Sequence, residues 1–146
     1  MVKGERKMMV LRVAAAITLA WASLAHAKVC TESAANAADA MVDQLDSWDK
    51  VNITFTKYGH CDDGEIAEGN SEAIARLLVD HWQTLPQLGA LIKRNPPLKA
   101  FVLRHIDTTL DTGDLDKITT LSTSSCPAGM GALCRELASA ASHAEQ

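Results

Sequence analysis

Four cysteines constrain the fold of this chain more than any other feature of its sequence. They are Cys30, Cys61, Cys126 and Cys134. An even number of cysteines in a small exported chain is typical of two disulfide bonds, and four cysteines allow three pairings. We favour Cys30–Cys61 with Cys126–Cys134, because these two bonds close the shortest loops.

Disulfide geometry also limits the shape of residues 31–60. A straight helix of that length would hold its ends about 45 Å apart. The Cα atoms of a disulfide lie within about 7 Å of each other, and Cys126 lies at most about 28 Å from Cys134. No pairing of all four cysteines fits such a straight helix. We therefore expect the chain to bend between Cys30 and Cys61, unless one of the two bonds is missing.

The first 27 residues have the pattern of a secretory signal peptide. Four basic side chains come first, an uncharged Ala-rich stretch over residues 13–25 follows, and Ala-His-Ala ending at Ala27 matches the cleavage pattern. The apolar stretch is shorter than the roughly 20 residues of a membrane span. A buried N-terminal helix is the alternative. We predict a signal peptide over residues 1–27, cleavage after Ala27, and a mature helical domain over residues 28–146 in the periplasm.

Removal of that segment leaves an acidic chain. Residues 28–146 contain 10 basic and 17 acidic side chains, a net charge of −7 with neutral histidines. A surface of this sign disfavours nucleic acid and, after signal removal, an anionic membrane as partner. It favours a basic protein or a cationic ligand, because complementary potentials speed encounter. Solubility alone would account for the same charge.

The spacing of apolar residues predicts an all-α fold, a compact bundle of about five to six helices with two disulfides. Proline, glycine and aspartate mark the short connections between the helices. The expected helices run from Glu32 to Trp48, from a cap at Asp62 or Asp63 to Trp82, across Leu88–Ile92, from Pro97 to Ile106, from Asp111 to Leu121, and from Cys126-Pro127 to Leu137.

Residues 51–56 fit the pattern of a strand as well as that of a helix. They alternate apolar and polar side chains as a strand does, yet the helical register of Leu45, Trp48 and Phe55 continues through them. The chain has no second strand pattern that could pair with them. We interpret this segment as a helix that distorts or ends near Asn52, where the disulfide geometry also favours a bend.

The sequence contains no motif for catalysis or metal binding. His60 adjoins Cys61, but sequence neighbours rarely form a thiol–base pair, and an exported Cys61 is expected to be bridged. The acidic stretches 60–68 and 111–116 lack the ligand spacing of a calcium loop, and paired cysteines leave no zinc cluster. We predict no enzyme activity, no cofactor and no metal site, while a hydrolase with scattered residues stays open.

Several stretches resemble a group of small exported helical proteins. That group is similar, in size, export, helix content and cysteine use, to the periplasmic immunity proteins of type VI secretion amidase effectors. The resemblance implies an all-helical protein that binds a secreted peptidoglycan amidase, occludes its Cys–His active-site groove and protects the producing cell. The residues that carry it are Tyr58-Gly59-His60-Cys61-Asp62-Asp63-Gly64, Ile66-Ala67-Glu68-Gly69, Ser71-Glu72, Asp80-His81-Trp82, Phe101 to Asp107, Ser125-Cys126-Pro127 and Leu133-Cys134.

An acidic turn is the surface that we expect to contact the partner. A tyrosine would anchor it, its carboxylates would hydrogen-bond a histidinium or other basic groups, and a disulfide would brace it. The rival surface is the loop from Asp107 to Asp116, and helix capping alone would account for the carboxylates of both. The alternative function is a small periplasmic ligand- or metal-binding protein. The predicted partner-binding residues are Tyr58, His60, Asp62, Asp63 and Glu65.

Overall fold

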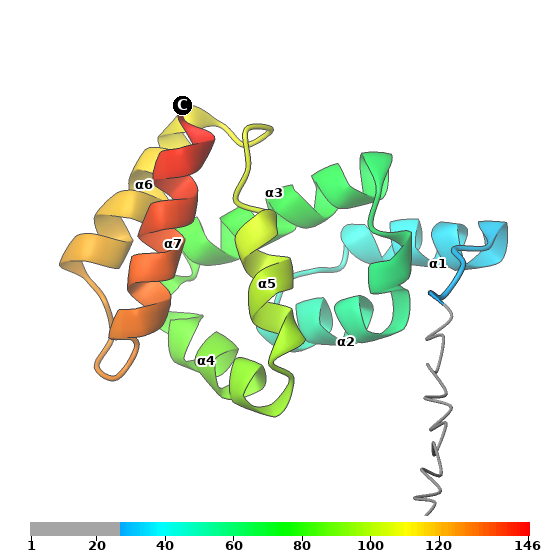
Figure 1. The fold of residues 1–146 in the computed structure, drawn as a ribbon, viewed down its shortest axis with the longest axis horizontal. Helices are drawn as coiled ribbons and strands as arrows, with labels where there is room; N and C mark the ends of the chain where they lie inside the picture. The colour runs from blue at the N-terminus through cyan, green and yellow to red at the C-terminus, as the bar shows by residue number, and fades with distance from the viewer. Residues whose placement is uncertain (1–26) are drawn as a thin grey trace, which may run out of the picture.

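The computed structural model describes residues 27–146, which form an all-α fold as predicted (Figure 1). The predicted signal peptide lies outside this described part, except for its last residue. Within residues 27–146, every helix is too short or too polar to span a bilayer. The helices of this part are α1 (Glu32–Val42), α2 (Trp48–Tyr58), α3 (Gly64–Asp80), α4 (Leu85–Arg94), α5 (Pro97–Arg104), α6 (Thr112–Ser124) and α7 (Gly131–Ala144), with single 3-10 turns at Gly59–Cys61 and Trp82–Thr84.

Several helices begin where the sequence offers a capping side chain. Thr31 and Ser47 cap α1 and α2 through hydroxyls that accept hydrogen bonds from amides three residues further on. Asp63 and Asp111 cap α3 and α6 through their carboxylates. Such caps satisfy amides that have no partner inside the helix. Of the two carboxylates expected to cap α3, Asp63 does so and Asp62 does not.

The chain bends over residues 43–47, between α1 and α2, whereas α2 runs unbroken through Asn52. The bend that disulfide geometry requires is confirmed, but the predicted distortion near Asn52 and the single helix predicted up to Trp48 are wrong. Ser47 gives α2 a cap of its own, which favours a new helix at this point. The break also lets Leu45 and Trp48 enter the core, where they are 2% and 1% exposed.

Both disulfides form with the predicted pairing. The Cα atoms are 5.0 Å apart for Cys30–Cys61 and 6.1 Å apart for Cys126–Cys134. The first bond ties the segment before α1 to the turn between α2 and α3, and the second closes the loop between α6 and α7. Each bond therefore fixes a segment that lies outside the regular helices.

The last helix starts later than predicted. α7 begins at Gly131, whereas a start at Cys126-Pro127 was expected. The Met130 amide donates to the Pro127 carbonyl at 3.0 Å, and Gly129 has a φ of +79°. A right-handed helix does not continue through a left-handed residue, and glycine adopts that conformation readily. The disulfide loop therefore contains a turn where the sequence suggested helix.

The core is built around α3. Its buried face carries Ile74 and Leu78, both 0% exposed, on the apolar stripe that the sequence predicts. α6 and α7 pack against each other at one end of the molecule (Figure 1). The Trp82 indole, which follows α3, donates a hydrogen bond to the Ser125 carbonyl at 2.8 Å and so connects the end of α3 to the end of α6.

We expect Ile74→Ala to lower the free energy of unfolding by about 2–5 kcal/mol, because it leaves a cavity in a close-packed core. Ile53→Ala is the matched control, since Ile53 is 45% exposed, and we expect it to change stability by less than about 0.5 kcal/mol. Urea unfolding followed by far-UV circular dichroism measures both values. Equal effects of the two substitutions would contradict the position of α3 in the core.

Candidate functional site

Asp62 was expected on the surface, but it is the centre of a buried hydrogen-bond network. Its side chain is 3% exposed. Its carboxylate accepts from Asn70 Nδ2 at 2.9 Å and from Arg104, whose Nε lies 3.1 Å away and whose Nη2 also contacts it. His105 Nε2 lies 3.1 Å from the same carboxylate. Asp62 thus fastens the turn after α2 both to α3 and to the end of α5.

Burial by itself would raise the pKa of Asp62, but the surrounding donors outweigh that effect. Hydrogen bonds from His105, Arg104 and Asn70 hold the pKa of the carboxyl well below its usual range. Asp62 is therefore ionised at neutral pH, and its oxygens only accept hydrogen bonds. Arg104 is further held by the Phe101 ring, whose centroid lies 4.9 Å from the guanidinium carbon.

Ser71 extends the network to the loop after α5. Its Oγ lies 2.9 Å from His105 Nδ1, 3.1 Å from Asp107 Oδ2 and 3.1 Å from the Ala67 carbonyl. Asp107 in turn orders its own loop, because its Oδ1 accepts a hydrogen bond from the Thr109 amide at 2.8 Å. The turn and the loop that the sequence offered as rival surfaces are therefore connected through Asp62, His105, Ser71 and Asp107.

Ser71, His105 and Asp62 are the residue types of a hydrolase triad, but their setting is structural. Ser71 and His105 are 1% and 3% exposed. Ser71 also lies in the interior of α3, where backbone amides bond within the helix and form no oxyanion hole around its hydroxyl. This cluster connects α3, the turn before it and the end of α5, and its serine hydroxyl is closed off from solvent.

Three clefts flank α3, and carboxylates line each of them. One of about 470 Å³ lies between α3 and the start of α6, one of about 340 Å³ between α1 and the start of α3, and one of about 270 Å³ between the bend after α1 and the end of α3. We call the carboxylates that line these clefts the acidic face. They are Asp39, Asp43, Asp46, Asp63, Glu65, Glu72, Asp80, Asp111 and Asp114.

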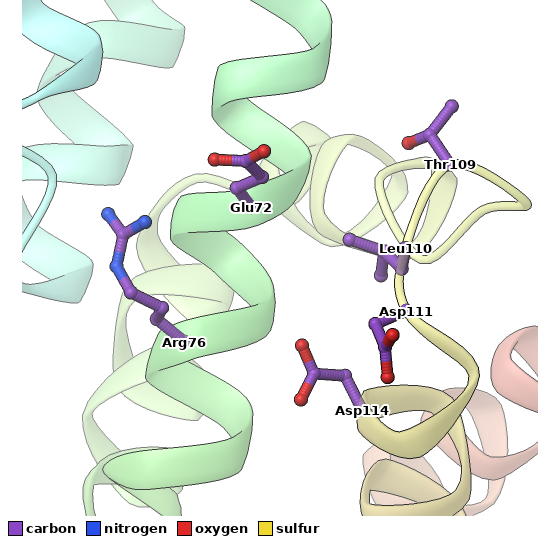
Figure 2. A pocket seen from close by; sticks show the side chains of 6 residues that line it. All are labelled: Glu72, Arg76, Thr109, Leu110, Asp111 and Asp114. Carbon is purple, nitrogen blue, oxygen red and sulfur yellow. The ribbon is translucent and has the colours of Figure 1, made fainter.

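Figure 2 shows the largest of these clefts. Asp111 and Asp114 come from the start of α6, and Glu72 and Arg76 come from α3, with Arg76 extending away from the two aspartates in this view. Leu110 points from the loop toward α3 and forms an apolar part of the lining. Nowhere in residues 27–146 are three or more histidine, cysteine or carboxylate side chains grouped so as to hold a metal ion.

Charge is segregated along the chain. Residues 81–106 carry Lys93, Arg94, Lys99 and Arg104 and no carboxylate. These cations belong to α4 and α5, whereas the acidic face belongs to α1, α3, the bend after α1 and the start of α6. Around α3 itself carboxylates outnumber cations, although Arg76 lines two of the three clefts, Lys50 pairs with Asp46 at 2.7 Å and Lys117 lies 3.8 Å from Asp80.

Two of the five residues expected to contact a partner lie on the acidic face. Asp63 and Glu65 are exposed and line the cleft between α1 and α3. Tyr58 and His60 are half-buried beside them in the chain. Asp62 points inward to the network. The acidic turn is therefore only partly exposed. Asp63 and Glu65 face solvent, whereas the carboxylate of Asp62 is buried in hydrogen bonds within the protein.

The partners of Asp62 could not be found from motif spacing. Ser71 and His105 are separated by 34 residues, and Asp62 and His105 by 43. One signal was present in the sequence: Asn70 and Ser71 interrupt the apolar stripe of α3, and buried polar side chains need hydrogen-bond partners. The carboxylates of α1 gave no signal, because solvent-facing acidic residues are ordinary on a helix.

We expect Asp62→Asn to lower the free energy of unfolding at neutral pH by about 1–3 kcal/mol, since the buried donors of Asn70 and His105 then lose their charged acceptor. A carboxyl with a lowered folded-state pKa stabilises the fold above its unfolded pKa of about 3.9, and this contribution is lost as the pH falls through the folded-state pKa. The difference in free energy of unfolding between wild type and Asp62→Asn should therefore become smaller in acid. Urea unfolding at a series of pH values measures it.

Asp63→Asn is the matched control for that series. Asp63 is exposed and caps α3, and asparagine is also a good cap, so we expect a change of a few tenths of a kcal/mol at most. A difference for Asp62→Asn that is independent of pH, or no larger than that of Asp63→Asn, would contradict the network.

No family model, no curated protein and no solved structure matches this chain. The resemblance to immunity proteins of type VI secretion amidase effectors therefore stays a prediction from the sequence. What the structure adds is a braced acidic surface, and any function has to be argued from that surface.

Proposed function

We propose that this protein is exported and acts by binding, with its acidic face docked on a basic surface of a secreted peptidoglycan amidase whose active site it occludes. It would then be a periplasmic immunity protein that protects the producing cell from cleavage of its cell wall. The observation that carries the proposal is the acidic face, whose nine carboxylates line three clefts around α3. The identity of the partner comes from the resemblance of the sequence.

Electrostatics supports a basic protein as the partner. A concentrated negative surface attracts a positive one over distance, which raises the association rate and disfavours acidic competitors. The cations of α4 and α5 belong to other segments of the chain than the acidic face. The cations beside that face, Arg76, Lys50 and Lys117, are fewer than its nine carboxylates, so its net charge is negative. Binding through this face should be weakened by salt, because exposed charges are screened.

The rigidity of the acidic face supports binding as well. The Cys30–Cys61 bond fixes one side of the turn before α3, and the contacts of Asp62 fix the other side. A surface that is already ordered loses less conformational entropy when it binds. The face is therefore suited to tight binding without a large rearrangement.

Asp63 and Glu65 are the carboxylates best placed to enter a groove. They lie at the start of α3, beside α1 (Figure 1), and both are exposed. Carboxylates there can accept charge-assisted hydrogen bonds from a catalytic histidinium or from basic groups at the rim of the amidase groove. Inhibition would then be steric and electrostatic, and this chain would contribute no chemical step.

We expect the double variant Asp39→Lys plus Glu65→Lys to weaken binding to an amidase encoded beside this gene by at least about tenfold, or about 1.4 kcal/mol. Both side chains are exposed, line the same cleft and cap no helix, so the fold should be kept. Isothermal titration calorimetry measures the affinity, and release of soluble peptidoglycan fragments by the amidase measures inhibition.

Asp116→Lys plus Glu145→Lys is the control for this experiment. It makes the same change in net charge at residues that line none of the three clefts. We expect it to keep affinity and inhibition within a few-fold of wild type. Equal losses in the two double variants, or an amidase that wild type neither binds nor inhibits, would reject the proposal.

The largest cleft favours a second candidate function, binding of a small cationic ligand. Its volume of about 470 Å³ falls within the range of small-molecule sites. Three carboxylates, those of Glu72, Asp111 and Asp114, line it against one cation, Arg76. A thermal-shift series with a polyamine such as spermidine separates the two functions. A rise in Tm that Asp114→Asn abolishes would favour the ligand binder over the inhibitor.

A further inference from the structure

An apolar groove lies between α4, α5 and the start of α7, which are neighbours in Figure 1. Its volume is about 190 Å³. It shares no lining residue with the three clefts of the acidic face. We call it the α4–α7 groove, and its larger apolar side chains are those of Ile92, Met130 and Leu133.

The shape of this groove is set before anything binds. Gly89 of α4 is buried, and a Cβ there would fall 2.7 Å from Met130 Sδ, so the methionine lies directly against the helix. The Cys126–Cys134 bond closes the loop that carries Met130. Ile92 and Met130 are half-buried, so each keeps apolar surface available to a ligand. A thioether adapts readily to the shape of what it contacts.

The size of the groove favours one side chain of a larger partner. Sites for whole small molecules usually measure about 300–1,000 Å³, and this groove is well below that range. Protein interfaces commonly place one apolar anchor of the partner in a pocket of the other chain. A concave groove of this size also favours a protruding side chain over the flat surface of a bilayer.

The rim of the groove is basic. Lys93 is exposed and takes part in none of the ion pairs of residues 27–146. Lys99 pairs at 2.8 Å with Glu136, the carboxylate of the lining, so one cation remains in excess. The start of α7 contributes the same sign, because no side chain caps it and its first turn has no carboxylate. Carboxylates beside an apolar anchor would therefore complement this rim.

We propose that the α4–α7 groove is a second docking surface, which takes one apolar side chain from an acidic segment of a protein partner. A carboxylate next to that side chain pairs with Lys93. The acidic face selects a partner of the opposite charge and shares no residue with this groove. The inference therefore goes beyond the proposed function and does not rest on it.

Titration with short peptides tests the groove without an identified partner. The probe is the acetylated and amidated peptide Gly-Glu-Leu-Glu-Gly, and ¹H–¹⁵N spectra of the disulfide-bonded protein follow its binding. We expect shifts at the amides of Gly89, Gly129 and Ala132, with a Kd of about 1 mM or tighter. The matched peptides Gly-Glu-Ala-Glu-Gly and Gly-Lys-Leu-Lys-Gly lack the anchor or carry the wrong charge. We expect each to bind about fivefold or more weakly.

Lys93→Glu tests the contribution of the rim. We expect it to weaken binding of Gly-Glu-Leu-Glu-Gly by about threefold or more, because it replaces an attractive contact with a repulsive one. Lys57→Glu is the matched control, since it makes the same change at an exposed lysine of α2 that does not line the groove. We expect it to change the Kd by less than about twofold, because salt screens distant charges. Far-UV circular dichroism verifies that both variants fold.

Several outcomes would overturn the proposal. They are the absence of shifts in the groove at peptide concentrations up to about 10 mM, equal binding of the three peptides, and equal losses in the two variants. Vesicles of phosphatidylglycerol provide the remaining arm. If they bind the protein through Lys93 while the peptide does not bind, the groove faces an anionic membrane and the proposal is rejected. No amidase takes part in this experiment, so the proposed function stands or falls separately.

Discussion

The ionised carboxylate of Asp62 is the interaction on which the arrangement of the site depends. Taking a charge out of water costs several kcal/mol, and only well-placed donors offset that cost. Asn70, Arg104 and His105 supply them from α3 and α5. Because those donors come from two helices, satisfying one carboxylate also fixes the turn before α3 against both. The acidic surface then follows from where this turn is held.

Local chemistry made much of the fold predictable. Helix caps and apolar periodicity depend on residues within a turn or two of each other, so the all-α class and a helix start at Asp62 or Asp63 could be predicted from the sequence. Disulfide geometry predicted a bend between Cys30 and Cys61, but its position at residues 43–47 does not follow from apolar spacing, which continues across it to Trp48. The inward direction of Asp62 depends on His105, 43 residues away, and no local pattern encodes such a contact.

The two segments that the sequence offered as alternative partner-binding surfaces are connected in the structure. The turn before α3 and the loop after α5 border the same helix and share the Asp62–His105–Ser71–Asp107 chain of contacts. Of the predicted contact residues, Asp63 and Glu65 remain on the outside while Asp62 supports them from within. A partner that touched both segments would therefore meet a single preformed surface.

The Cys30–Cys61 bond depends on the compartment in which the chain folds, because thiols stay reduced in the cytosol and pair outside it. α1 packs closely on α3, and a Cβ at Gly69 would fall 2.3 Å from Val42. The bond adds a covalent link between the segment before α1 and the turn before α3. Under the proposed export, α1 and the carboxylate of Asp39 would therefore gain this link only after the chain has left the cytosol.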